Sequence, residues 1–149
     1  NKLRGQNAGA RTVTVFLSSN RFREDLQQYA NSATYTFITP TSDTLEITQA
    51  ALAVLKEIYR PGILYKKSGV IVGDICDMSM LQMNLFDPVS NRKERSDLMK
   101  AIDELNHRYG LKTVKLMAEG ESKQPWQVKC EHRSQNYLTD INEILTVRI

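Results

Sequence analysis

The chain has 149 residues, of which 41% are hydrophobic and 25% are charged, and its formal net charge is +3. This composition is typical of one ordinary globular domain or two small ones, and it argues against a disordered chain or a membrane-spanning segment. The mild positive charge permits nucleic acid as a partner without requiring it. Two cysteines, Cys76 and Cys130, fit a reducing compartment better than a disulfide scaffold, so we expect a cytoplasmic protein with no membrane partner.

Alternating residues predict two strands in the first part of the chain. Residues 11–18 place three aliphatic side chains on one face, and residues 33–38 alternate threonines with Tyr35 and Phe37. A polar loop, residues 19–31, separates them. Such strands suit an antiparallel pair with one face toward solvent. That face would carry hydroxyls instead of carboxylates, which suits an anionic neighbour.

A helix is expected after Pro40 and before Pro61-Gly62. Asp43 is its expected N-cap, and Glu46, three residues later, would complete a capping box. Its side chains at helical spacing predict a core-facing stripe. The stripe contains Ile47, Ala51, Val54 and Ile58, widened by Leu45, Leu52, Leu55 and Tyr59.

Residues 65–75 are expected to form a further strand. Its continuous apolar run, Val70-Ile71-Val72, is typical of a central strand buried on both faces, and the adjacent Gly69 suits a close approach to the backbone. Asp74 and Asp77 follow the run, but two acids without a third favour structural or solvated carboxylates over a metal site.

No catalytic or metal-ligating residue is predicted. The two histidines, His107 and His132, lie in no recognisable motif with a nucleophile, and the histidines and cysteines show no zinc-ligand spacing. A glycine-rich phosphate loop of nucleotide-binding type is also absent from the sequence.

The segment from Leu81 to Asp87, followed by Pro88, is short, apolar and hard to type by periodicity. It is either a short strand or loop folded onto its own domain, which local features favour, or a peptide that docks in a pocket of another protein. Beyond it, residues 92–109 predict a helix with Leu98, Ile102 and Leu105 as its apolar stripe and Met99 beside them.

Strand-like runs at residues 113–117, 125–128 and 144–149 complete a small α/β subdomain after this helix. The fold class expected for the whole chain is therefore α+β, with an antiparallel or mixed sheet under helical cover. The single helix of the first half gives less cover than such a sheet usually has. We therefore expect the chain to be cut from a longer protein.

Basic residues gather in the first half and predict contact with phosphates. Together with hydroxyl side chains they would position a duplex through its backbone without reading bases. An ordinary solvated surface explains them equally well. The candidates are Arg11, Arg21, Arg23, Lys66 and Lys67, with Thr34 and Thr36.

Four segments resemble, in order and spacing, the C-terminal part of UmuC-type translesion DNA polymerases of the Y family. They are Asn31-Ser32-Ala33, Thr39-Pro40-Thr41-Ser42-Asp43, Tyr65-Lys66-Lys67-Ser68-Gly69-Val70 and Gln82-Met83-Asn84-Leu85-Phe86-Asp87. The resemblance covers most of the chain, including Trp126-Gln127.

The resemblance implies three parts. Residues 1–77 would be a partial little-finger domain that lacks its first strand and first helix, residues 78–91 a linker with a clamp-binding peptide, and residues 92–149 a small C-terminal domain. An exposed sheet face left by the missing elements would favour self-association of the chain.

The resemblance also implies binding sites. In the little finger, Lys66 and Lys67, with Ser32 and Thr34 on the neighbouring strand, would contact phosphates of primer-template DNA. Gln82, Met83, Leu85 and Phe86 would bind the sliding clamp, and Met83, where the common form has Leu, would weaken this binding at most.

The function implied is error-prone DNA synthesis in SOS mutagenesis and DNA repair. The family's catalytic carboxylates and magnesium belong to an upstream palm domain, so this chain alone should need no cofactor and be inactive. Partners implied are duplex DNA, the sliding clamp, a UmuD-type accessory subunit and a recombinase filament. The alternatives are a stand-alone clamp-binding adaptor without DNA affinity, or a small nucleic-acid-binding domain.

Overall fold

The computed structural model describes residues 2–80, 87, 89, 91–110 and 112–120. It contains two compact units, Asn1–Val114 and Lys115–Ile149, and the sheet and all helices longer than one turn that it describes belong to the first. None of the described helices combines the length and the apolar character that a membrane crossing requires.

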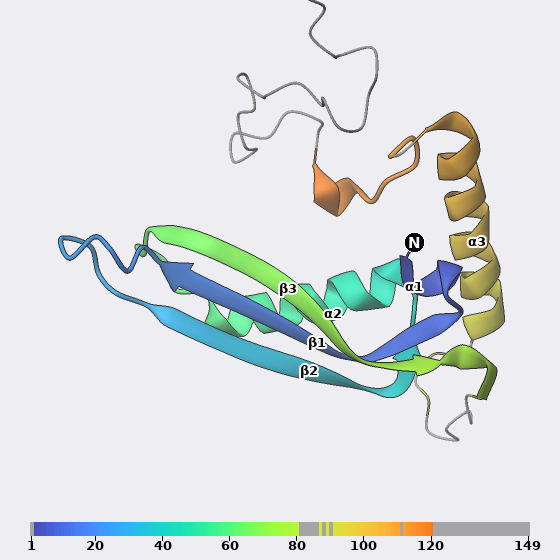
Figure 1. Ribbon diagram of the computed structural model, residues 1–149, viewed down its shortest axis with the longest axis horizontal. Helices are drawn as coiled ribbons and strands as arrows, with labels where there is room; N and C mark the ends of the chain where they lie inside the picture. The colour runs from blue at the N-terminus through green and yellow to red at the C-terminus, as the bar shows by residue number, and fades with distance from the viewer. Residues whose placement is uncertain (1, 81–86, 88, 90, 111, 121–149) are drawn as a thin grey trace, which may run out of the picture. The chain divides into compact units, whose positions relative to one another are not determined.

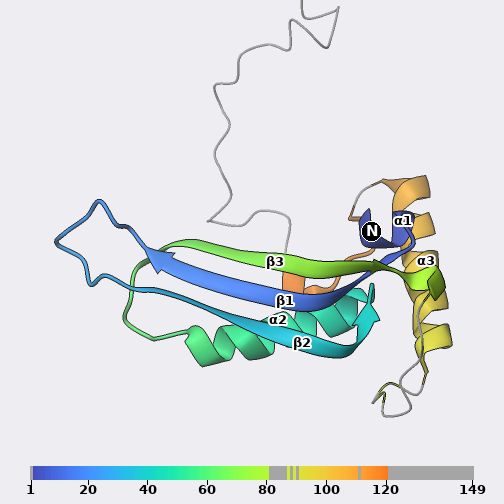
Figure 2. The ribbon, with the colours of Figure 1, turned by 60° about the horizontal axis from the view of Figure 1, so that its bottom comes forward.

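A three-stranded antiparallel sheet forms the centre of the first unit. It consists of β1 (Ala8–Ser19), β2 (Ala30–Thr41) and β3 (Tyr65–Asp77) in the order β2-β1-β3, so β1 is the central strand. Helix α2 (Thr44–Ile58) covers one face of the sheet (Figures 1 and 2). This arrangement confirms the predicted α+β class and leaves the other face open along the strands.

The core lies between β1 and α2. Val13, Val15 and Leu17 are buried, as their alternation predicts, and they pack with Val54 and Ile58 of the helix. Each such side chain contributes about 1.5–3 kcal/mol on burial. The intervening β1 residues face the open side, so the period-two pattern sets which face of the sheet is wet.

The prediction that the 70–72 run is buried on both faces is wrong. Val70 and Ile71 are 55% and 56% exposed, because β3 pairs only with β1 and lies at the edge of the sheet in the part of the chain that is described. An apolar edge strand is a template for pairing with another strand. Self-association of the chain through this region therefore stays a prediction.

Helix α2 begins as predicted but without the capping box. Asp43 is the N-cap, and its Oδ1 accepts a hydrogen bond from the backbone N–H of Leu45 at 2.7 Å. The backbone N–H of Asp43 donates to Thr41 Oγ1 at 3.1 Å instead of to Glu46. Glu46 is drawn away by Arg92, whose Nη1 lies 3.5 Å from its Oε2. Leu52 and Tyr59, expected in the stripe, are exposed.

The second long helix, α3 (Arg92–Tyr109), has the predicted bounds but not the predicted buried stripe. Met99, expected beside the stripe, is its buried residue, whereas Leu98 and Leu105 of the stripe itself are exposed. Most of the inward face is polar and is held by ion pairs to the rest of the unit, as described below. Gly110, with φ of 106°, ends the helix as expected.

Three short helical turns complete the described residues: α1 (Lys2–Gly5), η1 (Met78–Met80) and η2 (Met117–Glu119). The strand predicted at 113–117 is wrong. The amide side chain of Asn106 bonds to both backbone groups of Val114, at 2.8 and 2.9 Å, and so occupies the groups that a strand would pair. The strands predicted at 125–128 and 144–149 lie outside the described residues, and the three predicted parts remain predictions.

Candidate nucleic-acid interface

Several threonine hydroxyl groups lie on the open face of the sheet. The strand register pairs Thr12 with Thr36 and Thr14 with Thr34 across β1 and β2, and directly paired residues share a face. The hydroxyls of Thr14 and Thr34 lie 2.7 Å apart and are hydrogen-bonded. This face therefore offers uncharged hydrogen-bonding groups and no charge repulsion toward an anionic partner.

A pocket of about 700 Å³ lies where β1 leaves the sheet and β2 enters it. Three cationic side chains line it, Arg21, Lys66 and Lys67, and the described residues of its lining include no carboxylate. In the described residues these three cations form no ion pair. Their charge is therefore available to a ligand.

The floor of this pocket depends on a glycine. The ring of Phe16 lies against Gly69 of β3, and a Cβ on that glycine would come within 2.5 Å of the ring. The close approach predicted at Gly69 is thus confirmed. It keeps an aromatic surface on the open face beside the basic residues, because Phe16 also lines the pocket.

The structure divides the residues predicted to bind DNA. Ser32, Arg21, Lys66 and Lys67 line one pocket, and Thr34 lies two residues along β2 on the same face as Ser32. Arg23 is instead paired with Asp25 in the loop. Arg11 is exposed at a bulge near the start of β1, at the far end of the sheet from the pocket.

The loop over the pocket, residues 20–29, is ordered by its own polar groups. Gln28 Nε2 lies within hydrogen-bond distance of the backbone carbonyls of Asn20, Arg23 and Leu26, at 3.1, 2.8 and 3.2 Å. Sequence reasoning assigned no role to Gln28 or to Phe22 in this loop. An isolated aromatic residue in a polar loop was the available signal.

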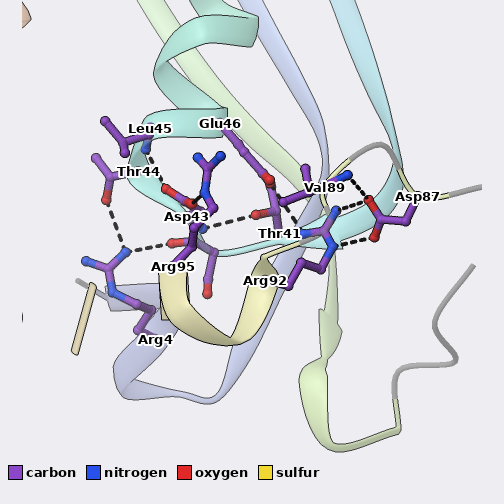
Figure 3. Close-up of polar contacts among 11 residues, drawn as sticks. Arg4, Thr41, Asp43, Thr44, Leu45, Glu46, Asp87, Val89, Arg92 and Arg95 are labelled. Atoms are coloured by element: carbon purple, nitrogen blue, oxygen red, sulfur yellow. Dashed lines mark hydrogen bonds and ion pairs between the residues drawn. The ribbon is translucent and has the colours of Figure 1, made fainter. Parts of the chain in front are cut away.

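A second polar cluster lies at the opposite end of the sheet and joins α1, α2 and α3 (Figure 3). Arg4 reaches Asp103, and Arg95 reaches the N-cap Asp43. Arg92 binds the carboxylate of Asp87 with two nitrogens, one of them 2.8 Å from Oδ1. These contacts explain how a helix with little buried apolar surface docks on the domain.

Asp87 directly follows the predicted clamp-binding residues, and the pKa of its carboxyl group is strongly lowered. The guanidinium of Arg92 and the backbone N–H of Val89 lower the pKa of Asp87 to about 2. The residues before it, Gln82, Met83, Leu85 and Phe86, lie outside the described residues. The chain is thus held at Asp87, immediately after that segment.

We expect Asp87→Asn to lower stability by about 1–2 kcal/mol near neutral pH, after allowance for partial solvent screening. The pKa of Asp87 is lower in the folded than in the unfolded state, so the ion pair stabilises the fold above pH 4 or so. This contribution is lost as the pH falls toward the folded-state pKa of about 2. Urea unfolding between pH 3 and 7 checks this.

The matched control for that experiment is Asp97→Asn, which removes an exposed carboxylate from α3, the helix that carries Arg92. It should change the free energy of unfolding by less than about 0.5 kcal/mol at every pH. A constant difference between Asp87→Asn and the parent across the pH range would contradict the assignment.

The described residues do not fit a metal site. No group of three or more histidine, cysteine, aspartate or glutamate side chains is placed to hold an ion in the part of the chain that is described. Asp77, one of the two acids considered, accepts hydrogen bonds from the N–H and Oγ of Ser79 at 2.8 and 2.7 Å. These bonds hold its pKa below the usual range and give it a structural role.

Comparison with known proteins places this chain in a family. A model described as the impB/mucB/samB family C-terminal domain matches residues 1–85, more than half of the chain. The chain belongs to the impB/mucB/samB family. The predicted resemblance to UmuC-type proteins is confirmed, and the open sheet with its basic pocket lies within the matched C-terminal domain.

Two curated proteins match nearly the whole chain, and a third matches 72% of it. Protein UmuC of Salmonella typhimurium is 36% identical over 147 residues, which cover 99% of this chain and 35% of that protein. Protein ImpB of Salmonella typhimurium is 35% identical over 148 residues, or 99% and 34%. Protein MucB of Escherichia coli is 35% identical over 107 residues, or 72% and 25%.

The chain thus spans about a third of the length of the first two of these relatives. A second family model, described as a domain of unknown function (DUF4113), matches residues 96–147. No solved structure matches the chain significantly.

Proposed function

We propose that this chain is the DNA-binding and sliding-clamp-binding region of an error-prone translesion DNA polymerase. Its place in the impB/mucB/samB family supports the polymerase, because UmuC-type proteins, which it resembles, are such enzymes. The observation that carries DNA binding is the basic pocket at the end of an open, hydroxyl-lined sheet face.

The chemistry of this face suits a duplex backbone. Unpaired Lys and Arg side chains neutralise phosphates, and Ser and Thr hydroxyls donate to phosphate oxygens without reading bases. Lys67 is paired with Ser18 across β1 and β3, so it lies on the open face beside the pocket. A translesion enzyme benefits from such contacts, since they hold DNA of any sequence.

We expect Lys66→Ala combined with Lys67→Ala to reduce the salt dependence of duplex binding. Each phosphate contact contributes about 0.9 to the slope of log affinity against log salt, so the slope should fall by about 2. Fluorescence anisotropy of a labelled blunt duplex at several salt concentrations measures this directly.

The matched control replaces Lys56 and Lys93 by alanine. Both are exposed, and Lys56 lies on α2, on the covered side of the sheet. The net charge changes equally, so a general electrostatic effect would lower the slope in both double variants. An unchanged slope in the Lys66 and Lys67 variant removes these residues from the DNA contact.

Clamp binding is proposed for Gln82, Met83, Leu85 and Phe86. Gln82 would bond at the edge of an apolar pocket on the clamp, and Leu85 and Phe86 would fill it. The anchoring of Asp87 by Arg92 supports this proposal, because it holds the segment's end on the domain that holds DNA. A bound clamp would then tether the polymerase to the same duplex.

The two alternatives are separated by the same assays. A clamp-binding adaptor would bind clamp but show no salt-dependent affinity for duplex, whereas a plain nucleic-acid-binding domain would do the reverse. Contacts with a UmuD-type subunit or a recombinase filament, a cytoplasmic location, and magnesium chemistry in an upstream palm domain follow from the resemblance and stay part of the proposal.

A further inference from the structure

The loop that borders the basic pocket presents one aromatic side chain to solvent. Phe22 is 96% exposed and lines the pocket together with Phe16 and the three cations. A fully exposed phenylalanine contributes nothing to the core. The loop residues on either side of it, Arg21 and Arg23, are both basic.

Phe22 is exposed although its loop is ordered by internal hydrogen bonds. The backbone N–H of Phe22 donates to Asn20 Oδ1 at 3.1 Å, which closes a tight turn directly before the ring. Gln28 holds the remainder of the loop through three backbone carbonyls, and Tyr29 and Ser19 close its base with hydrogen bonds of 2.8 and 2.9 Å. The backbone that carries the ring is therefore ordered in advance, which lowers the entropic cost of binding.

The groups around the Phe22 ring indicate which kind of ligand it could bind. An aromatic surface beside unpaired cations, with no carboxylate among the described residues of the pocket, suits a planar group joined to phosphates. Nucleobases stack on exposed aromatic side chains independently of sequence, and adjacent Lys and Arg bind the phosphates on either side. A pocket of about 700 Å³ is large enough for such a group.

We propose that Phe22 stacks on an unpaired nucleobase, with Arg21, Lys66 and Lys67 binding the flanking phosphates. This inference rests on the proposed DNA-binding function and adds a single-strand subsite to it. The open sheet face then holds duplex, and the loop takes a base beyond the paired region or one displaced from it. Such a contact recognises a single-strand junction and not a sequence.

The test uses the 149-residue chain with three probes: an oligothymidylate, a blunt duplex, and the same duplex carrying one unpaired 2-aminopurine. Phe22→Ala should weaken oligothymidylate binding about tenfold, since the stacking of one base on an aromatic side chain is lost. Blunt-duplex affinity should change less than about twofold. Binding of the parent should quench the 2-aminopurine, and Phe22→Ala should lose this signal.

Two further variants complete the experiment. Phe22→Tyr keeps the aromatic ring and should retain both the affinity and the quenching. Tyr109→Ala removes an exposed aromatic side chain from the end of α3 and should change neither. These results together support a stacking site.

Equal binding of oligothymidylate by Phe22→Ala and the parent overturns the inference while leaving DNA binding by the sheet intact. An equal loss for single strand and blunt duplex also overturns it, because the ring would then support the loop or the duplex contact generally. Absence of salt-dependent binding to any probe by the parent overturns the proposed function, and the inference with it.

Discussion

Leu85→Ala combined with Phe86→Ala is expected to weaken binding to the sliding clamp about 1000-fold. Each residue would fill an apolar pocket on the clamp, and truncation of a buried anchor of this kind costs about 2 kcal/mol or more. Two such losses correspond to three orders of magnitude in the dissociation constant. Surface plasmon resonance with immobilised clamp measures the change.

The control for this variant truncates two large apolar side chains elsewhere in the chain. Leu98→Ala combined with Leu105→Ala truncates two exposed leucines of α3, which should leave clamp affinity within about twofold. Met83→Leu should bind at least as tightly as the parent. If the Leu85 and Phe86 variant binds clamp as the parent does, the segment is part of the fold and not a docking peptide.

Arg4→Met is expected to lower the free energy of unfolding by about 3 kcal/mol, the largest effect on stability that we predict. Arg4 Nε and Nη2 donate to the two carboxylate oxygens of Asp103 at 2.6 and 2.8 Å. Its Nη1 donates to the carbonyl of Ser42 at 2.6 Å and lies 3.1 Å from Thr44 Oγ1. One guanidinium thus ties α1 and the start of α2 to α3.

The burial of this ion pair explains the size of the effect. The side chains of Arg4 and Asp103 are 14% and 23% exposed, and the guanidinium lowers the pKa of Asp103, so the carboxylate is ionised at neutral pH. Without Arg4 a largely buried charge has no partner, which costs more than the pair gains by forming. Urea unfolding at pH 7 measures the free energy of unfolding of Arg4→Met and of the parent.

Arg23→Met is the matched control, because Arg23 and Asp25 form an ion pair that is 56% and 59% exposed. Solvent screens an exposed pair of this kind, and this variant should barely change the unfolding curve. Arg4→Met with Asp103→Leu should recover part of the stability lost in Arg4→Met alone. If Arg4→Met costs no more than Arg23→Met, the pair does not fasten α3 to the domain.

Local sequence determined the existence of the strands and the helix of the first half, which face of β1 is buried, and where α2 begins. The alternation of Val13, Val15 and Leu17 places them inward in any sheet with one buried face, and Asp43 caps α2 through a contact two residues away. Such information is contained within a few consecutive residues, so no knowledge of distant partners is needed.

Part of the candidate site could also be predicted from the sequence. Lys66, Lys67 and Arg21 are recognisable as basic residues next to strands, and Ser32 and Thr34 as hydroxyl side chains on a strand. The meeting of Arg21, Ser32, Lys66 and Lys67 in one pocket required the pairing of β3 with β1, which brings Lys67 opposite Ser18. The same composition would be an ordinary solvated surface if the strands were ordered differently.

Which strands pair and which side chains contact each other was decided only by the tertiary structure. The apolar run at Val70 and Ile71 is compatible with a centre or an edge strand, and the order β2-β1-β3 placed it at the edge. Glu46 does not complete the predicted capping box, because Arg92, far along the chain, pairs with its carboxylate. A residue's periodicity reports the face it occupies, whereas its partner depends on contacts between distant segments, which no local pattern encodes.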